Sequence, residues 1–342
     1  MPSFCRHGRL EANCPICAKN QRASFTPAGP ARRSADAKPA VRPGTVTGQQ
    51  EQRRRAAGHR GAGAVRVRRM ARAADDGYRN ELVSGIRATA DAALFADELA
   101  FSIARLEQLT TDAPGMYGEA AAAPDREEGL WLAFLIAYLA PLEDDDPWAG
   151  IRAAHVPWAT GELPRLEGVP VGPRGAHDPA RGERTIAAYR AWAQRAGSQK
   201  AAFIGDPSWD PARRYTRDFE RLALPGFGRT PRYELLTILR HLGMLDVQPT
   251  SLQLTVDPMD PTVVAAKRAF GIGEPTELRH RISHLVRELD VPMESLDLAL
   301  VNWNRPPNAP RITAGAAVDA DPERRALLRY ALGVDAPDDV PA

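Results

Sequence analysis

The stretch that decides the fold is residues 221–271, RLALPGFGRTPRYELLTILRHLGMLDVQPTSLQLTVDPMDPTVVAAKRAFG. Apolar residues recur at helical spacings on both sides of LPGFG, which spans residues 224–228. Two glycines two positions apart permit a sharp turn and expose consecutive backbone N–H groups at the start of the next helix. The residues alone leave two interpretations open: an ordinary helix–helix turn, or a site for an anion such as a DNA phosphate.

This turn and the downstream segment that begins at Asp260 together resemble the helix-hairpin-helix DNA glycosylase superfamily, which includes the endonuclease III and adenine glycosylase types. In that superfamily the hairpin binds backbone phosphate and an aspartate opens a nearby helix. The resemblance implies a catalytic role for Asp260, with Asp257 as the close alternative because Val-Asp also fits the local family pattern. The gap from hairpin to aspartate is longer here than in standard members. The DNA-binding residues that the resemblance implies are Leu224, Pro225, Gly226, Phe227, Gly228, Arg229 and Thr230.

A carboxylate suits the implied chemistry. Breaking an N-glycosidic bond builds positive charge on the sugar, which a fixed carboxylate stabilises while it orients the attacking water. The target base must first leave the stack for a pocket. A purely structural role for either aspartate is the alternative, because aspartate followed by proline is a common helix start.

Departures from the superfamily pattern limit the type of reaction that we expect. Bifunctional members carry a Schiff-base lysine two residues after the last hairpin glycine, where this chain has Thr230. A monofunctional reaction with water is therefore expected. The iron–sulfur cysteines of many members are missing, and so is the glutamine pair that often wedges into the duplex. We therefore expect other residues to open the base pair.

The three cysteines all lie within the first seventeen residues. Three thiolates and an imidazole are the ligand set of a closed structural zinc site, although redox thiols are an alternative. The expected Zn²⁺ ligands are Cys5, His7, Cys14 and Cys17. The opening FCRHGRLEANCPICAK, combined with the hairpin–aspartate module, resembles the bacterial and phage family of alpha-glutamyl/putrescinyl thymine pyrophosphorylase, clade 3. That resemblance implies a hypermodified or glucosylated pyrimidine as substrate and a role in antiphage defence.

Charge is divided unevenly along the chain. The net charge is +2, yet residues 1–75 hold 16 Lys or Arg against 4 Asp or Glu. A basic arm on an acidic body points to a polyanionic partner. The longest apolar run, residues 130–142, is shorter than the roughly 20 residues that a membrane span needs. With no signal-peptide pattern at the N-terminus, we expect a cytoplasmic protein without membrane contact.

Helical periodicity dominates from Tyr78 onward, and alternating strand patterns are nearly absent. The fold class predicted is all-α: a two-lobed, helix-hairpin-helix glycosylase-like body at residues 76–342, a zinc segment at 1–20 and a flexible basic linker at 21–75. The apolar segment 127–139 is expected to be the central buried helix. Further helices are predicted at 183–196, 211–222, 231–242, 261–270, 275–289, 292–303 and 321–333.

The function predicted from these features is monofunctional excision of a modified pyrimidine from DNA. The expected partner is double-stranded DNA, including phage DNA with modified bases, bound by a monomer. One alternative is an enzyme of the same fold that modifies a thymine-derived base without removing it. The other is a non-catalytic DNA-binding protein, in which the hairpin grips phosphates and Asp260 only caps a helix.

Overall fold

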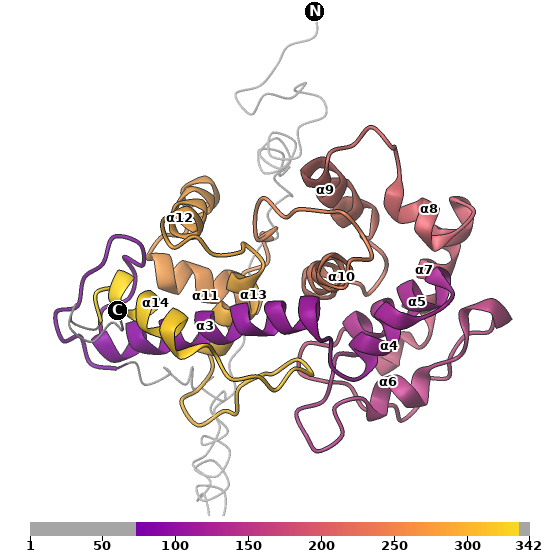
Figure 1. The fold of residues 1–342 in the computed structure, drawn as a ribbon, viewed down its shortest axis with the longest axis horizontal. Helices are drawn as coiled ribbons and strands as arrows, with labels where there is room; N and C mark the ends of the chain where they lie inside the picture. Colours follow the sequence, from indigo (N-terminus) through magenta and orange to yellow (C-terminus); the bar gives the residue numbers. More distant parts are fainter. Residues whose placement is uncertain (1–72, 335–342) are drawn as a thin grey trace, which may run out of the picture. The chain divides into compact units, whose positions relative to one another are not determined.

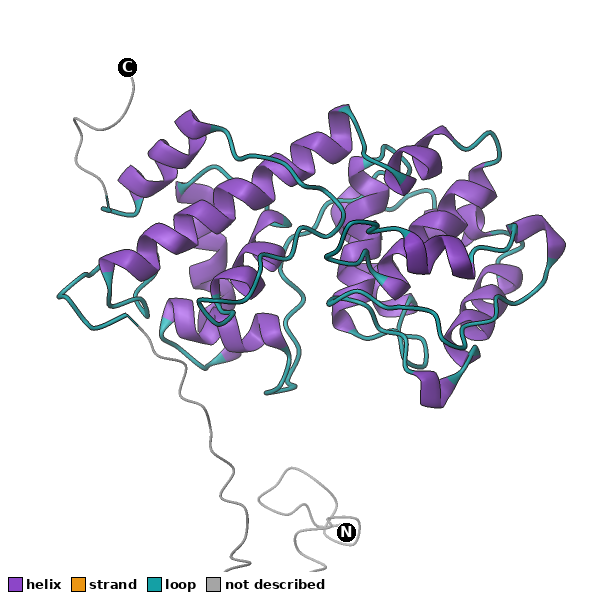
Figure 2. Ribbon diagram, turned by 90° about the horizontal axis from the view of Figure 1, so that it is seen from below, coloured by secondary structure: helices purple, strands orange, loops and turns teal. Residues whose placement is uncertain are grey.

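The computed structural model describes residues 73–334 (Figure 1). All regular structure in this range is helical and none of it is strand, which confirms the all-α class for this part of the chain (Figure 2). No helix within these residues is long and apolar enough to cross a membrane. The Cys/His segment and the basic arm up to residue 72 lie outside the described range, so the expectations for them stay predictions.

One group of helices is organised around the long helix α3, Thr89–Thr111. α13 (Ser295–Trp303) and α14 (Pro322–Ala331) pack against α3. α11 (Pro261–Phe270) contacts both α13 and α12 (Pro275–Glu288). Helices from the two ends of the described chain therefore build this group together, as Figure 1 shows.

A second group surrounds α5, Arg126–Leu139, in which every side chain from Gly129 to Leu139 is buried. This confirms the central helix predicted from the apolar run. α4, α6, α8 and α10 all contact α5, and α10 also contacts α3 of the first group. The helices of this group are α4 (Met116–Ala122), α6 (Ala149–Ala154), α7 (Arg184–Arg195), α8 (Gln199–Ile204), α9 (Pro211–Arg221) and α10 (Arg229–His241), with short 3₁₀ helices η2 (Trp158–Thr160) and η3 (Pro179–Arg181).

Aspartate–proline pairs start several of these helices. The side chains of Asp210, Asp260 and Asp321 each accept a hydrogen bond from a first-turn N–H group, and proline follows each of them. An aspartate cap contributes about 1 kcal/mol, and proline at the first helical position loses no hydrogen bond. The predicted starts of α9, α11 and α14 therefore match the structure within one residue.

The prediction was wrong at residues 78–88, which form turns rather than the beginning of the first helix. Most of the apolar side chains there are buried without being helical. The Tyr78 hydroxyl donates to the Leu332 carbonyl at 2.5 Å, and the Gly85 N–H donates to the Ala269 carbonyl at 2.9 Å. Tertiary contacts with α11 and α14 thus outweigh the local helical pattern. The short helices α4 and α8 were not predicted either.

Candidate functional site

The predicted hairpin turn, residues 224–228, lies in the connection that joins α9 to α10, residues 222–228. Gly226 has φ = +79°, a left-handed conformation that favours glycine. Gly228 is the N-cap of α10 and provides no side chain to cap it. A Cβ atom placed on Gly228 would meet no atom within 4 Å. The first N–H groups of α10 therefore follow an open glycine, an arrangement suited to an anion.

Two of the seven predicted DNA-binding residues have side chains directed into the protein. Phe227 is 1% exposed, and its ring centre lies 5.1 Å from that of Phe134. Arg229 is 4% exposed, and its guanidinium donates to the Leu252 carbonyl and the Thr262 hydroxyl, both at 3.0 Å. These two residues can offer DNA only their backbone groups.

The Arg229 guanidinium belongs to a buried ion cluster. Asp297 accepts from Arg229 and from Arg174, each at 2.5 Å. Glu234 accepts from Arg105 at 2.5 Å and lies 3.5 Å from Arg174. Buried charges require such partners, because removal from water costs several kcal/mol per ion. The cluster joins α3, α10, α13 and the loop before η3, so it ties the two helix groups together.

The cluster holds Asp297 in its ionised form. Burial acts to raise the pKa of Asp297, but the guanidinium groups of Arg229 and Arg174 outweigh it and lower that pKa to about 2. Burial acts to lower the pKa of Arg229, but the charges of Asp297 and Asp260 contribute to a net rise. Asp297 is thus a permanent anion at neutral pH rather than a proton donor. With three arginines and two carboxylates, the cluster keeps one positive charge in excess.

Asp260 lies close to the hairpin end of α10. Its carboxylate accepts from the Thr262 N–H at 2.9 Å and from the Val263 N–H at 3.2 Å, and it is partly exposed. Its charge acts on Arg229, which also bonds the Thr262 side chain. Asp257 lies exposed in the preceding loop, where it accepts from the Met259 N–H at 2.9 Å. Of the two aspartates, Asp260 has the position beside the hairpin.

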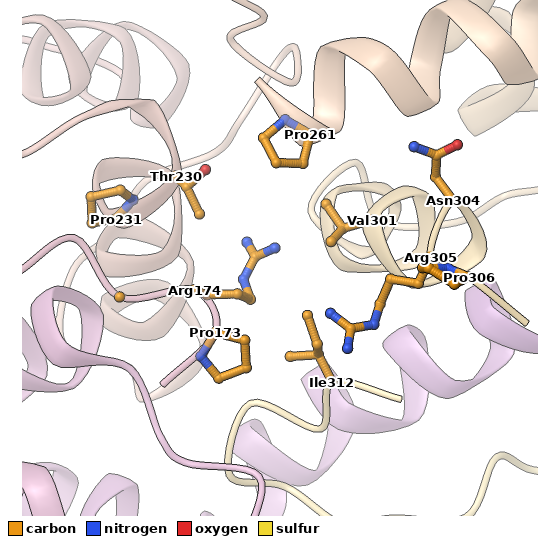
Figure 3. A pocket seen from close by; sticks show the side chains of 11 residues that line it. Pro173, Arg174, Thr230, Pro231, Pro261, Val301, Asn304, Arg305, Pro306 and Ile312 are labelled. Atoms are coloured by element: carbon orange, nitrogen blue, oxygen red, sulfur yellow. The ribbon is translucent and has the colours of Figure 1, made fainter. Parts of the chain in front are cut away.

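A pocket of about 430 Å³ opens where these elements meet (Figure 3). Thr230 and Pro231 from the start of α10 line it, together with Pro261 from the start of α11. The other lining residues are Pro173, Arg174, Gly175, Val301, Asn304, Arg305, Pro306 and Ile312. The N-termini of α10 and α11 therefore meet at one cavity, and Asp260 directly precedes the proline that forms part of its wall.

Two guanidinium groups line this pocket, those of Arg174 and Arg305 (Figure 3). Arg174 also donates to Asp297 in the buried cluster. The Nε atom of Arg305 is buried and has no hydrogen-bond partner, and its guanidinium makes no ion pair with any residue in the range 73–334. A pocket with two guanidinium groups in its wall can therefore bind an anionic or electron-rich group.

Most of the residues that line the pocket belong to a region of family similarity. Residues 176–312 match the sequence model of alpha-glutamyl/putrescinyl thymine pyrophosphorylase clade 3. The family's name is that of an enzyme acting on a modified thymine. The matched region includes the hairpin, Asp260, Asp297 and Arg305, and it begins two residues after Arg174. A search of curated proteins found no match. A search of solved structures found none either.

Three residues of the site were not predicted from the sequence: Arg174, Asp297 and Arg305. Asp297 could have been found, because a charged residue within the apolar helix SLDLALVNW indicates a buried partner of opposite charge. Arg174 and Arg305 lie in loops beside prolines, where no periodic pattern indicates which way a side chain points. Only the folded chain brings these two guanidinium groups to one cavity.

No metal site emerges in the described part of the chain. Between residues 73 and 334, no group of three or more His, Cys, Asp or Glu side chains could hold a metal ion. The predicted zinc ligands Cys5, His7, Cys14 and Cys17 lie outside that range.

Proposed function

We propose that this chain is a DNA glycosylase that hydrolyses the N-glycosidic bond of a modified pyrimidine, with Asp260 as the catalytic carboxylate. The observation that carries the proposal is the pocket at which α10 and α11 begin, lined by Pro261, the residue directly after Asp260. The family match supports a modified thymine as the base that the enzyme would recognise. Phage DNA, in which such bases occur, is the proposed source, and defence against phage the proposed role.

The charges around the pocket complement those of the expected transition state. Heterolysis of the bond between C1′ and the base nitrogen leaves positive charge on the sugar and negative charge on the departing base. Asp260, which directly precedes the pocket-lining Pro261, can stabilise the sugar cation. Arg174 and Arg305 inside the pocket, with the N-termini of two helices, can stabilise the departing base. A carboxylate outside and cations inside therefore suit a base that enters the pocket.

Water completes the proposed reaction. No lysine is among the described residues that line the pocket, and Thr230 occupies the position of the Schiff-base lysine in bifunctional enzymes. Water adds to C1′, its proton is lost to solvent, and the departing base gains a proton. The products are the free base and an abasic site.

DNA binding is proposed to come from several parts of the chain. The backbone N–H groups after Gly228 would bind one phosphate. The basic arm would add salt-dependent affinity without contacting bases. A structural zinc ion held by Cys5, His7, Cys14 and Cys17 would order the N-terminal segment against DNA or the helical body.

A second candidate is an enzyme that exchanges a substituent on a thymine-derived base while the base stays attached to DNA. The word pyrophosphorylase in the family's name favours this candidate, because phosphate oxygens are natural ligands of two arginines. In that case Arg305 and Arg174 would bind the substituent rather than the departing base.

The test uses the full chain with duplexes that carry thymine, 5-hydroxymethyluracil, glucosylated 5-hydroxymethylcytosine, or a putrescinyl or glutamyl thymine. Mass spectrometry would detect released base, and alkaline cleavage would detect abasic sites. We expect release from at least one modified duplex and at least about a 100-fold loss of rate in Asp260→Asn. Asparagine caps helices about as well as aspartate, so this variant loses the charge and keeps the cap.

Asp257→Asn is the matched control, because Asp257 is an exposed aspartate three residues away. We expect it to retain activity. Release that depends on Asp257 and not on Asp260 would overturn the assignment of the carboxylate. An altered base still attached to DNA would favour the second candidate. Tight binding without any product would favour the non-catalytic alternative.

A further inference from the structure

Two apolar side chains just before α11 are far more exposed than the rest. Val256 is 97% exposed and Met259 is 80% exposed. The next most exposed large apolar side chain within residues 73–334 is Leu327, at 49%. Exposing a whole valine and a whole methionine forgoes about 1.5–3 kcal/mol of burial for each. A partner that covers them would recover that energy.

These side chains belong to a structured turn, residues 255–260, here called the wedge loop. The Asp257 carboxylate accepts from the Met259 N–H at 2.9 Å, and the Asp260 N–H donates to the Asp257 carbonyl at 3.3 Å. Asp260 then caps α11. Met259 therefore projects from the chain immediately before the proposed catalytic carboxylate, at a position fixed by the turn and by the helix start.

Cationic side chains line two cavities that adjoin the wedge loop, one at Val256 and one at Pro261, the residue directly after the loop. A second cavity of about 360 Å³ has Val256 in its wall together with Lys267 and Arg279, and none of the described residues that line it is acidic. On the side of Pro261, the candidate site contains Arg174 and Arg305. Exposed apolar side chains next to cavities that contain cationic side chains match a DNA duplex, whose apolar base stack is flanked by phosphates.

We propose that Met259, together with Val256, inserts into the base stack beside the target nucleotide and fills the space left when that nucleotide turns out toward Asp260. Apolar wedges of this kind unstack a base step at a cost of a few kcal/mol and hold the duplex open. The inference rests on the proposed action on duplex DNA. It also gives the chain a means of opening the pair without the glutamine pair that is absent from its sequence.

The test measures unstacking directly and needs no catalysis. A duplex carries 2-aminopurine, whose fluorescence rises when it unstacks, next to a 5-hydroxymethyluracil–adenine pair. Fluorescence anisotropy of a labelled strand establishes the protein concentration that saturates binding. We expect the full chain to increase 2-aminopurine fluorescence several-fold at saturation. The Met259→Ala and Val256→Ala double variant should reduce that increase at least about threefold at its own saturating concentration.

Two further variants test the assignment. Leu327→Ala removes a remote exposed apolar side chain on α14, and it should leave the fluorescence increase unchanged. Met259→Leu keeps the apolar volume and should restore most of the increase in the presence of Val256. Circular dichroism and thermal unfolding of each variant establish that the fold is retained, as expected for side chains that contact solvent.

An undiminished fluorescence increase in the double variant would overturn the wedge, and so would saturated binding by the unaltered chain without any increase. Loss of the increase in Leu327→Ala as well would also overturn it. A different result would overturn the proposed function. If no duplex releases free base, the chain is not a glycosylase, whatever the 2-aminopurine fluorescence shows. Unstacking that depends on Met259 without base release therefore supports the wedge and rejects the glycosylase.

Discussion

Replacing Asp297 by asparagine is the most direct test of how the site is held together. The substitution keeps the size of the side chain and removes the negative charge between Arg229 and Arg174, whose side chains are 2% and 5% exposed. Two guanidinium groups would then share a neutral partner in the interior. The loop that carries Arg174 and the helix that carries Arg229 both contribute residues to the pocket wall, so a loss of stability here would also disturb the site.

The expected magnitude follows from the pKa and the burial. The pKa of Asp297 falls from 3.8 to about 2 on folding, which corresponds to roughly 2–3 kcal/mol of stability at neutral pH. Breaking a buried pair costs about 3–5 kcal/mol, because the remaining charge is left without compensation. We therefore expect Asp297→Asn to lower the free energy of unfolding by about 3–5 kcal/mol at pH 7.

Urea unfolding followed by circular dichroism measures this difference, with exposed Asp145→Asn as the control that should change little. Because folding lowers the pKa of Asp297, its contribution is complete above about pH 4 and is lost as the pH falls toward 2. The gap between the unaltered chain and the variant should therefore narrow as the pH drops below 4. A difference in the free energy of unfolding below about 1 kcal/mol at pH 7 would refute the reasoning. A difference that stays the same as the pH falls would refute it too.

Two further predictions concern other parts of the chain. Burial raises the pKa of Asp218 to about 8, against partial opposition from Arg221 and Arg214, so its stabilising contribution is complete below about pH 4 and is lost as the pH rises toward 8. In urea unfolding, Asp218→Asn should exceed the unaltered chain in stability by much more at pH 9 than at pH 5, and an equal difference at both values would contradict this. The full chain should contain about one zinc ion per molecule by atomic emission, in line with one four-ligand site. Cys14→Ser with Cys17→Ser should lose that zinc, and retention would place the metal elsewhere.

The sequence predicted correctly those helix starts and buried faces that depend on residues close together in the chain. The start of α11 follows from Asp260 and the proline after it, and the burial of α5 follows from an apolar face that continues around the helix. In contrast, residues 78–88 carry apolar residues at helical spacing and still form turns. Gly85 shows why: a Cβ atom there would lie 2.0 Å from the Arg268 carbonyl, so the segment is fixed by close contact with α11. Such contacts leave no periodic trace in the sequence.

The candidate site was predictable to the same extent. The hairpin and Asp260 could be found because a turn and a helix cap each have their own residue signature. The direction of the Arg229 side chain could not be found that way, since arginine at the first position of a helix is equally compatible with solvent. Its burial depends on Asp297, 68 residues downstream. The cationic lining of the pocket depends likewise on Arg174, from a loop without periodicity.

The contacts of Arg229 explain how Asp260 can lie beside the hairpin although a long connection separates the two in the sequence. The Arg229 backbone begins α10 directly after Gly228, and its guanidinium bonds Thr262 in the first turn of α11 and Asp297 in α13. The spacing between hairpin and aspartate is therefore set by one buried side chain and not by the length of the loop between them. The exposed residues 256–259 of this connection can then carry side chains such as Met259 that contact solvent. A phosphate bound at Gly228 and a sugar facing Asp260 would be held in a fixed relation, because the same arginine anchors both helix starts.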